Sequence, residues 1–294
     1  MLTNPYILLT LAALGWGGNA VAGKLSTDGW QPFTIMAVRW LLVVAVILPF
    51  AWKHIKADKN ILKESGHYLL GLGMFGMALF SLLMFLALRY TTAINVSIEQ
   101  AAMPVMIILA NFFIMSQRVH LLQIVGVIVS IAGVVITTSE GNPAQLLVNG
   151  FNRGDAIMLL ACVFYAGYTF GLRWRPNVNW LTFITFIASG AFIMCLPFAL
   201  YELANGQYTT PDFGDWLIVL YIIIAPSIVS QICFAKGVEL IGGNRAGLFI
   251  NLVPIFGSVL AVIILREQFH WFHAAGIVLV VGGIMMAERF AEKV

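Results

Sequence analysis

The sequence predicts an all-α integral membrane protein, with ten transmembrane helices arranged as two inverted five-helix repeats. Hydrophobic residues make up 61% of the 294 residues and charged residues only 10%, whereas roughly a quarter of the residues in soluble domains are charged. The apolar residues form long runs, and most runs approach the ~20 residues that a helix needs to cross a bilayer. Blocks of the first half also return in the second half at a nearly constant distance along the chain.

Ten apolar segments can be marked, and together they leave little room for a soluble domain. The first segment lacks a basic stretch at its start, so we expect a spanning helix there rather than a cleaved signal peptide. The predicted spans are 4–24, 31–52, 67–90, 94–116, 121–138, 154–173, 179–202, 214–238, 244–265 and 271–288. The longest predicted loops are 53–66 and 139–153. The second of these carries Gly, Asn and Pro and is expected to join the halves, which gives a first repeat at 1–140, an inter-repeat loop at 141–152 and a second repeat at 153–294.

The distribution of Lys and Arg predicts the orientation of the chain. Ten spans place both ends on one side of the membrane. With the N-terminus in the cytoplasm, most basic residues fall in cytoplasmic connections, and the outer connections hold only Lys24, Arg89, Arg153 and Arg266. Because basic residues in short loops favour the cytoplasmic side, both the N- and C-termini are predicted to be cytoplasmic. The net charge of +3 is small and does not indicate nucleic acid as a partner. The informative feature is how the basic residues divide between the two sides of the membrane.

The repeat is visible as matched residues about 150 positions apart. Pro104, His120, Gly126 and Gly133 align with Pro254, His270, Gly276 and Gly283, and Leu48–Ala51 returns unchanged as Leu196–Ala199. Five helices per half is an odd number, so the second half must enter the membrane from the opposite side. Inverted repeats of this kind are typical of secondary transporters, whose substrate binds near the midplane between the halves.

Three stretches resemble a known family. They are Trp16-Gly17-Gly18-Asn19 followed by Lys24, Pro32 and Arg39; Ala87 to Ala93 leading towards Pro104; and Gly243 to Ala246 leading to Pro254 and Arg266-Glu267. These stretches resemble the EamA family of the drug/metabolite transporter superfamily, and the resemblance covers both halves. It implies a ten-helix carrier of the inner (plasma) membrane, not an enzyme, that moves small metabolites such as amino acids. It also implies a cavity lined by helices 1, 3, 4, 6, 8 and 9.

One acidic residue stands inside an apolar span. Glu99 lies roughly 7 Å into the fourth span, at 1.5 Å per residue, and Phe249 takes its place in the second half. An ionisable group at such depth is costly and indicates a functional role, so we expect Glu99 to bind a proton or a substrate amine. The alternative is a structural ion pair with Arg39, which enters the second span from the same outer side. A pair that opens when substrate arrives would serve both roles.

Aromatic and polar side chains mark a candidate substrate cavity. Trp16 and Tyr165 occupy equivalent places in the two halves, and Asn19 and Tyr168 each follow three residues later on the same helix face. Aromatic faces near a carboxylate suit a substrate that bears an ammonium group or an aromatic ring; the alternative is packing or interfacial anchoring.

Narrow polar stripes follow three other predicted helices. The stripe residues are Gln100 and Asn111 in the fourth span, Ser227, Gln231 and Phe234 in the eighth, and Asn251 and Ser258 in the ninth. Such stripes line a wet cavity or join helices by hydrogen bonds. Pro104 and Pro254 free backbone carbonyls and are expected to act as hinges, with simple kinks as the alternative.

Two glycine pairs, Gly126/Gly133 and Gly276/Gly283, predict close packing of the fifth and tenth spans, either within one chain or between two copies. The oligomeric state, monomer or homodimer, stays open on this ground. The sequence gives no sign of a cofactor or a bound metal, since His270 and His273 have no third ligand in view. Cys162, Cys195 and Cys233 lie in separate apolar spans and are expected to be buried free thiols.

These features together predict a secondary transporter that moves small amino acids or related amphipathic amino compounds by alternating access, linked to protons or driven by exchange. The partners are then a small-molecule substrate, protons and the lipid bilayer. One alternative is a carrier for quaternary ammonium compounds, nucleosides or organic acids. Further alternatives are a channel or another non-transporting membrane protein, and an intramembrane enzyme, for which no catalytic constellation is present.

Overall fold

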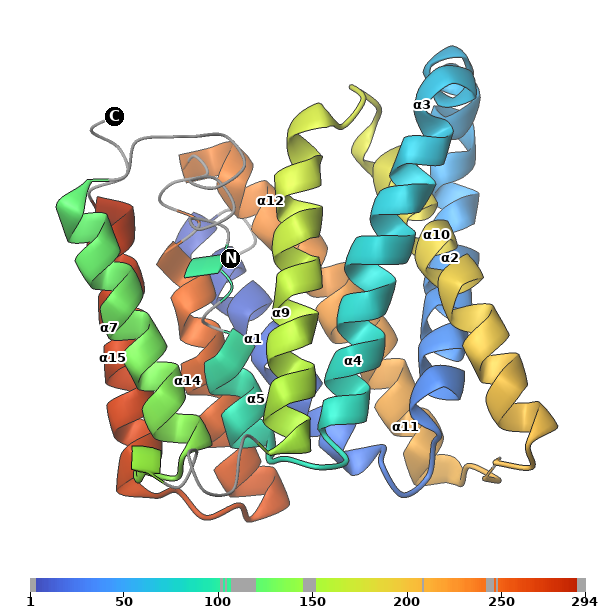
Figure 1. Ribbon diagram of the computed structural model, residues 1–294. Helices are drawn as coiled ribbons and strands as arrows, with labels where there is room; N and C mark the ends of the chain where they lie inside the picture. The colour runs from blue at the N-terminus through green and yellow to red at the C-terminus, as the bar shows by residue number, and fades with distance from the viewer. Residues whose placement is uncertain are drawn as a thin grey trace.

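The protein, described as a computed structural model over residues 4–100, 103, 105–106, 120–144, 152–207, 209–241, 246 and 248–289, is a bundle of helices (Figure 1). Every regular element in these ranges is helical, which confirms the all-α part of the predicted fold class. Seven helices in them are long and apolar enough to cross a membrane. Two shorter apolar helices, Phe249–Leu265 and Trp271–Ala287, lie at the ninth and tenth predicted spans. Most of the fourth predicted span, 94–116, lies outside the described residues.

The helices of the first half begin at residues that suit a helix start. Pro5 and Pro32 stand in the first turns of α1 and α2, where the missing N–H of proline costs nothing. The expected loop at 53–66 is wrong, because only Asp58 separates α2 from α3. Lys and Glu are good helix formers, so the helix continues past the apolar run. The elements are α1 (Pro5–Leu25), α2 (Pro32–Ala57), α3 (Lys59–Leu72), the π-helix η1 (Gly73–Ala78), α4 (Leu79–Ala87), α5 (Ala93–Gln100) and α7 (Leu121–Thr138).

The second half repeats one irregular feature of the first. A π-helix interrupts its third long helix, as η1 interrupts the third long helix of the first half. The elements are α9 (Arg153–Gly171), the 3-10 turn η2 (Leu172–Trp174), α10 (Trp180–Ala204), α11 (Phe213–Ile222), the π-helix η3 (Ile223–Val229), α12 (Ser230–Ile241), the 3-10 helix η4 (Leu248–Leu252), α14 (Val253–Leu260), the π-helix η5 (Ala261–Leu265) and α15 (Trp271–Arg289).

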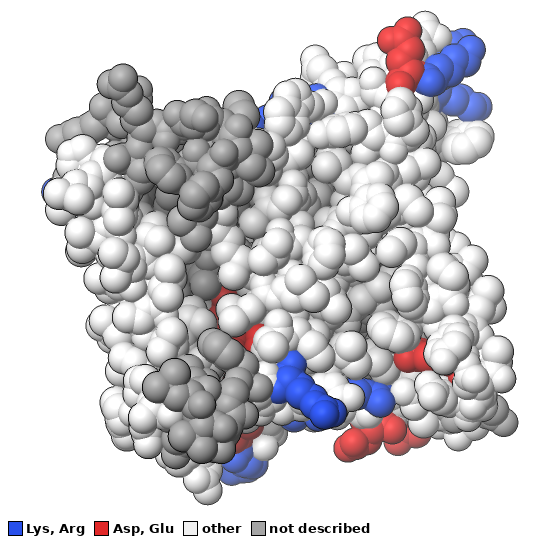
Figure 2. All heavy atoms as spheres, viewed as in Figure 1, with Lys and Arg blue, Asp and Glu red and all other residues white. Residues whose placement is uncertain are grey.

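Packing joins helices that are far apart in the sequence. α2 packs against α10 and α7 against α15, while α1 packs against α12 and α14, and α9 packs against α4 and α5 (Figure 1). Charged side chains gather at the two ends of the face drawn in Figure 2, and the band between them is nearly uncharged, apart from a few acidic atoms in a recess. This distribution is typical of a protein whose middle band meets lipid.

Glycines let α7 and α15 approach closely, as the sequence predicts. A Cβ atom on Gly126 would lie 2.5 Å from the carbonyl oxygen of Gly283, and one on Gly133 would lie 2.9 Å from that of Gly276. Backbone atoms of the two helices therefore occupy the space that larger side chains would need. The predicted close packing is confirmed, and it takes place within one chain.

The two ends of the α2/α10 pair are tied by carboxylates. Glu202, at the end of α10, accepts hydrogen bonds from the backbone N–H groups of Phe33 (3.2 Å) and Thr34 (2.8 Å) at the start of α2. Asp58, after α2, accepts one from the N–H of Asn179 (3.0 Å), just before α10. Each helix therefore supplies a cap for the other, and the two helices run antiparallel.

Candidate functional site

Glu99 lies at the centre of the candidate site. Its side chain is fully buried, and neither carboxylate oxygen has a hydrogen-bond partner among the described residues. Leaving a buried carboxylate without donors costs several kcal/mol, about 1–3 or more for each unmet group. An acidic side chain in this situation therefore indicates a group that arrives to meet it, such as a proton or a substrate cation.

The position of α5, which carries Glu99, is fixed at both ends of the helix. Glu267 follows η5 and accepts hydrogen bonds from the N–H groups of Ala93 (2.9 Å) and Ile94 (3.0 Å). A carboxylate at this place satisfies two of the free N–H groups of the first turn and complements the helix dipole. At the other end, Cys162 Sγ on α9 lies 3.6 Å from the carbonyl oxygen of Glu99 and donates to it.

A chain of buried polar groups leads from the start of α9 along α5. The hydroxyl of Thr91 donates to the Asp155 carboxylate, and the Asn95 side-chain amide donates to Thr91 Oγ1 at 3.3 Å. Asp155 is 1% exposed and Asn95 8%. Asn95 and Glu99 are one helical turn apart, so their side chains lie on one face of α5. The sequence analysis does not predict this series of hydrogen bonds, although Thr91, Asn95 and Glu99 follow one another at every fourth residue.

Arg39 on α2 is the buried cation of the candidate site. Its Nε donates to Ser227 Oγ on η3 (2.9 Å), its Nη1 donates to Asn19 Oδ1 on α1 (3.3 Å), and its guanidinium lies 5.1 Å from the ring centre of Trp40. Three helical segments thus meet at Arg39. In the part of the chain that the structure describes, no carboxylate lies within ion-pair distance of Arg39, and the alternative of an ion pair with Glu99 is not formed.

Trp16 on α1 reaches across to the second half. Its Nε1 donates to the carbonyl oxygen of Pro226 in η3 (3.2 Å), and its ring lies 5.2 Å from that of Phe234 on α12. The structure therefore brings Trp16, Phe234 and, through η3, Ser227 together. Nothing in the spacing of these residues indicated the role of Pro226.

Tyr165 and Tyr168 on α9 face the first half in a similar way. The ring of Tyr165 lies 5.0 Å from that of Phe80 on α4 and 5.6 Å from that of Tyr168. Gly76 in η1 lies against Tyr168, since a Cβ added there would overlap the tyrosine. No ring contact joins Trp16 to Tyr165 among the described residues.

The remaining predicted residues differ in their surroundings. Gln100 is buried and donates to the carbonyl oxygen of Val96 (3.3 Å), whereas Asn251 Nδ2 and Ser258 Oγ are buried without a described partner. Gln231 is half-buried on α12. Pro254 stands in the first turn of α14, where the 3-10 helix η4 changes to an α-helix. Pro104 and Asn111 lie outside the described residues.

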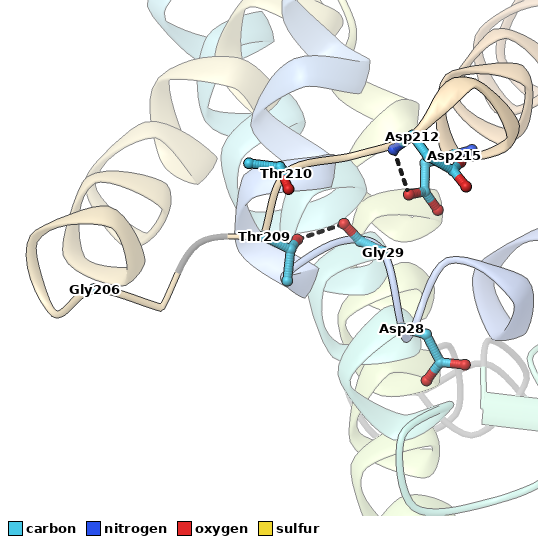
Figure 3. A pocket seen from close by; sticks show the side chains of 7 residues that line it. All are labelled: Asp28, Gly29, Gly206, Thr209, Thr210, Asp212 and Asp215. Atoms are coloured by element: carbon cyan, nitrogen blue, oxygen red, sulfur yellow. Dashed lines mark hydrogen bonds between the residues drawn. The ribbon is translucent and has the colours of Figure 1, made fainter.

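An open pocket of about 780 Å³ lies at one end of the bundle, between the loops that follow α1 and α10 (Figure 3). Its lining includes Asp28, Thr209, Asp212 and Asp215. Asp212 and Asp215 accept from each other's backbone N–H groups (2.9 and 2.8 Å), and Thr209 donates to the carbonyl oxygen of Gly29. These polar groups mostly cap a helix and join two loops, so the pocket is a weaker candidate than the buried charges.

Comparison with known proteins identifies the family of the chain. The pattern of the EamA-like transporter family matches residues 3–139 and again residues 152–288. The chain belongs to the EamA-like transporter family. It is therefore a multi-pass membrane protein of a transporter family, and membrane transport of small molecules is its general function.

Individual relatives agree with this membership. The chain is 26% identical over 284 residues to the uncharacterized transporter YetK of Bacillus subtilis (strain 168), covering 96% of this chain and 86% of that protein. An uncharacterized transporter of Archaeoglobus fulgidus is 26% identical over 292 residues, covering 97% of this chain and 98% of that protein. A solved crystal structure of another protein has a TM-score of 0.67 and 19% identity, and covers 98% of each chain. At this identity, the last likeness shows the fold alone.

Proposed function

We propose that this member of the EamA-like transporter family is a secondary transporter of small zwitterionic amino compounds, such as small amino acids. The observation that carries the proposal is the pair of buried opposite charges that do not meet. Glu99 is 0% exposed and Arg39 5% exposed, yet no ion pair joins them in the described part of the chain. Buried ions are normally paired, so an acidic and a basic side chain that do not pair with each other suit a substrate that carries both charges.

On this proposal Glu99 receives the ammonium group of the substrate. Its two free oxygens can accept two charge-assisted hydrogen bonds, which are about twice as strong as neutral ones. A carboxylate with donors already in place would offer much less to an arriving amine. The cost of a buried, ionised Glu99 is thereby offset when substrate binds.

Arg39 receives the substrate carboxylate. Asn19 and Ser227 hold the guanidinium through Nη1 and Nε, and the remaining N–H donors have no partner among the described residues. A guanidinium binds a carboxylate with two parallel hydrogen bonds and high geometric specificity. Trp16, Phe234, Tyr165 and Tyr168 supply aromatic walls, and Gln100, Gln231 and Asn251 supply polar groups for the rest of the substrate.

Alternating access between two inverted halves is the proposed mechanism. It is supported by π-helices at matching places, since η1 begins at Gly73 and η3 at Ile223, 150 positions later. π-helical turns are frequent at functional sites, and Trp16 bonds to one of them while Tyr168 packs against the other. Pro254 is proposed as a hinge in the second half, with Pro104 as its counterpart in the first.

The proposal also includes the cell inner (plasma) membrane as the location, cytoplasmic termini, and coupling to protons or to exchange of a second substrate. A panel of labelled compounds in proteoliposomes tests the substrate class. The panel holds small neutral amino acids, amines that lack the carboxylate, and acids that lack the amine. We expect uptake and trans-stimulation by amino acids, with at least tenfold weaker uptake of either truncated set, since each loses a charge-assisted contact. Protein-free vesicles are the control.

Transport of amines alone, or of acids alone, would contradict the assignment of a zwitterionic substrate. It would favour one of the alternative substrate classes, such as quaternary ammonium compounds or organic acids. Flux without trans-stimulation would instead indicate a channel.

A further inference from the structure

The hydrogen-bond chain that ends beside Glu99 has a fixed direction. Thr91 spends its single hydroxyl proton on Asp155, so its oxygen can only accept from Asn95. Asn95 must then present its NH₂ group to Thr91. Its carbonyl oxygen, Oδ1, points elsewhere and is buried with no donor among the described residues. The carboxylate of Asp155 thus sets the orientation of the whole chain.

The free end of this chain and Glu99 are neighbours on α5. Asn95 and Glu99 are four residues apart, the spacing at which side chains meet on a helix. Three buried oxygen atoms, Asn95 Oδ1 and both Oε atoms of Glu99, are therefore placed in one region with no described donor. Three buried acceptors without a donor are unfavourable, because each acceptor that loses its hydrogen bonds to water without gaining a new one costs about 1–3 kcal/mol.

One proton removes this conflict. A proton on Glu99 neutralises the carboxylate and turns one of its oxygens into an O–H donor, and Asn95 Oδ1, four residues away on α5, is an acceptor without a described donor. We propose that Glu99 holds a proton in this conformation, and that Asn95, aligned by Thr91 and Asp155, is the residue that keeps the proton there. This inference rests on the proposed function for the role of Glu99 in coupling.

The proposal gives a simple exchange at Glu99. When substrate arrives, the O–H bond of Glu99 breaks and the proton leaves to water, and the substrate ammonium donates to the same carboxylate in its place. No group is oxidised or reduced. Asn95 Oδ1 then accepts from the ammonium, so the amide serves both occupants without turning over. One proton is released for each amine bound.

Few other ionisable groups surround this chain. α7, α14 and η5, which pack against α5, carry none. α1 brings Lys24, whose Nζ donates to the carbonyl oxygens of Leu88 and Thr91 (2.7 Å each). α9 brings Arg153, Asp155 and Cys162, α15 brings the buried His273, and Glu267 caps the start of α5. Glu140, which follows α7, acts on Asp155 through its charge.

Infrared spectroscopy of the purified protein without substrate tests the proposal, because the C=O stretch of a protonated carboxyl group is separate from that of a carboxylate. We expect a buried protonated carboxyl band at neutral pH that disappears in Glu99→Gln. In Asn95→Leu the proton affinity should fall about tenfold, the size of one hydrogen bond. Thr91→Val should act in the same direction, because it frees the Asn95 amide to turn. Ser97→Ala removes another buried hydroxyl of α5 and should change nothing.

Three results would overturn the proposal: no protonated band in the wild-type protein, a band that survives in Glu99→Gln, or a proton affinity unchanged in both Asn95→Leu and Thr91→Val. Stabilisation of the empty protein by sodium over potassium, with no protonated band, would assign the site to a metal cation instead. The spectrum needs no transported compound. A correct band with no uptake of amino acids would therefore sink the substrate class alone, and uptake without the band would sink this inference alone.

Discussion

Arg39 Nε donates a hydrogen bond of 2.9 Å to Ser227 Oγ, and this bond joins helix α2 to the π-helical turn η3. Ser227 donates its own proton to the carbonyl oxygen of Ile222 at 2.6 Å, inside the same turn. The serine oxygen is therefore committed to accept from Arg39. Among the described residues, the partners that hold the guanidinium are all neutral.

The first prediction concerns substrate recognition by Arg39. Arg39→Lys keeps the positive charge but loses the planar fork, so we expect affinity for amino acids to fall about 10- to 100-fold, the range for a charge-assisted hydrogen bond. Binding of an amine without a carboxylate should change little. Thermal-shift titration of the purified variant measures both. Ser227→Ala is the matched control and should cost less, because the guanidinium remains. Equal amino acid affinity in Arg39→Lys and the wild type would remove Arg39 from the binding site.

The second prediction concerns coupling through Glu99. Glu99→Gln removes the group proposed to carry the proton, so uptake should no longer respond to a pH gradient across the vesicle membrane. The folded protein should keep its stability, because the amide is neutral like the proposed protonated carboxyl and still offers a donor to Asn95 Oδ1, which has no described donor. Uptake with and without the gradient, together with a melting curve, checks both parts. Glu239→Gln, at an exposed acid, is the control. Full pH-driven uptake by Glu99→Gln would contradict the role.

Sequence reasoning located the two buried charges but not their contacts. A carboxylate or guanidinium in an apolar run is visible from hydropathy alone. The position of the charged residue within the run gives its depth in the membrane. It does not give the direction in which the side chain points from its helix. Arg39 therefore seemed within reach of Glu99, whereas the structure turns it towards Asn19 and Ser227. Ser227 is 188 positions from Arg39, and no local pattern encodes such a contact.

Helix packing was easier to predict from the sequence, because the spacing of glycines indicates which helix face can approach another helix closely. The seven-residue spacing of Gly126 and Gly133 predicts a flat helix face, and the structure places Gly283 and Gly276 against it. The chain Asp155–Thr91–Asn95 was missed for the opposite reason. Thr91 and Asn95 are four residues apart, which is visible in the sequence, but Asp155 belongs to a helix that only folding brings near. Irregular turns such as η3 likewise depend on tertiary packing.

The third prediction tests the close approach of α1 and α14. A Cβ on Gly17 would lie 2.8 Å from the backbone nitrogen of Gly257 and 3.0 Å from the carbonyl oxygen of Val253. Gly17→Ala should therefore lower the free energy of unfolding by about 1–3 kcal/mol, the usual range for overpacking. In Gly167→Ala the new methyl group meets no atom within 4 Å. The free energy of unfolding of that variant should rise by up to about 1 kcal/mol, because alanine has a higher helix propensity than glycine. Thermal unfolding in detergent distinguishes the two, and equal melting temperatures would contradict the packing.

The fourth prediction concerns the carboxylate that ties α10 to α2. Glu202 is 3% exposed and accepts from the N–H groups of Phe33 and Thr34 and from the Thr34 hydroxyl (2.8 Å). Glu202→Ala leaves these donors without an acceptor, so we expect a loss of about 1–3 kcal/mol in the free energy of unfolding. Glu202→Gln keeps one acceptor oxygen and should lose less.

Asp58 provides the comparison at the opposite end of the same helix pair. It accepts a single hydrogen bond, from the N–H of Asn179, in an exposed setting. Water can replace that acceptor, so Asp58→Ala should cost only about 0.5–1 kcal/mol, near the low end for a helix cap. Chemical unfolding of the three variants in one detergent measures the order directly. If Asp58→Ala lowered the free energy of unfolding as much as Glu202→Ala, burial would not be what makes the Glu202 cap strong. The two caps of the α2/α10 pair would then stabilise the protein equally.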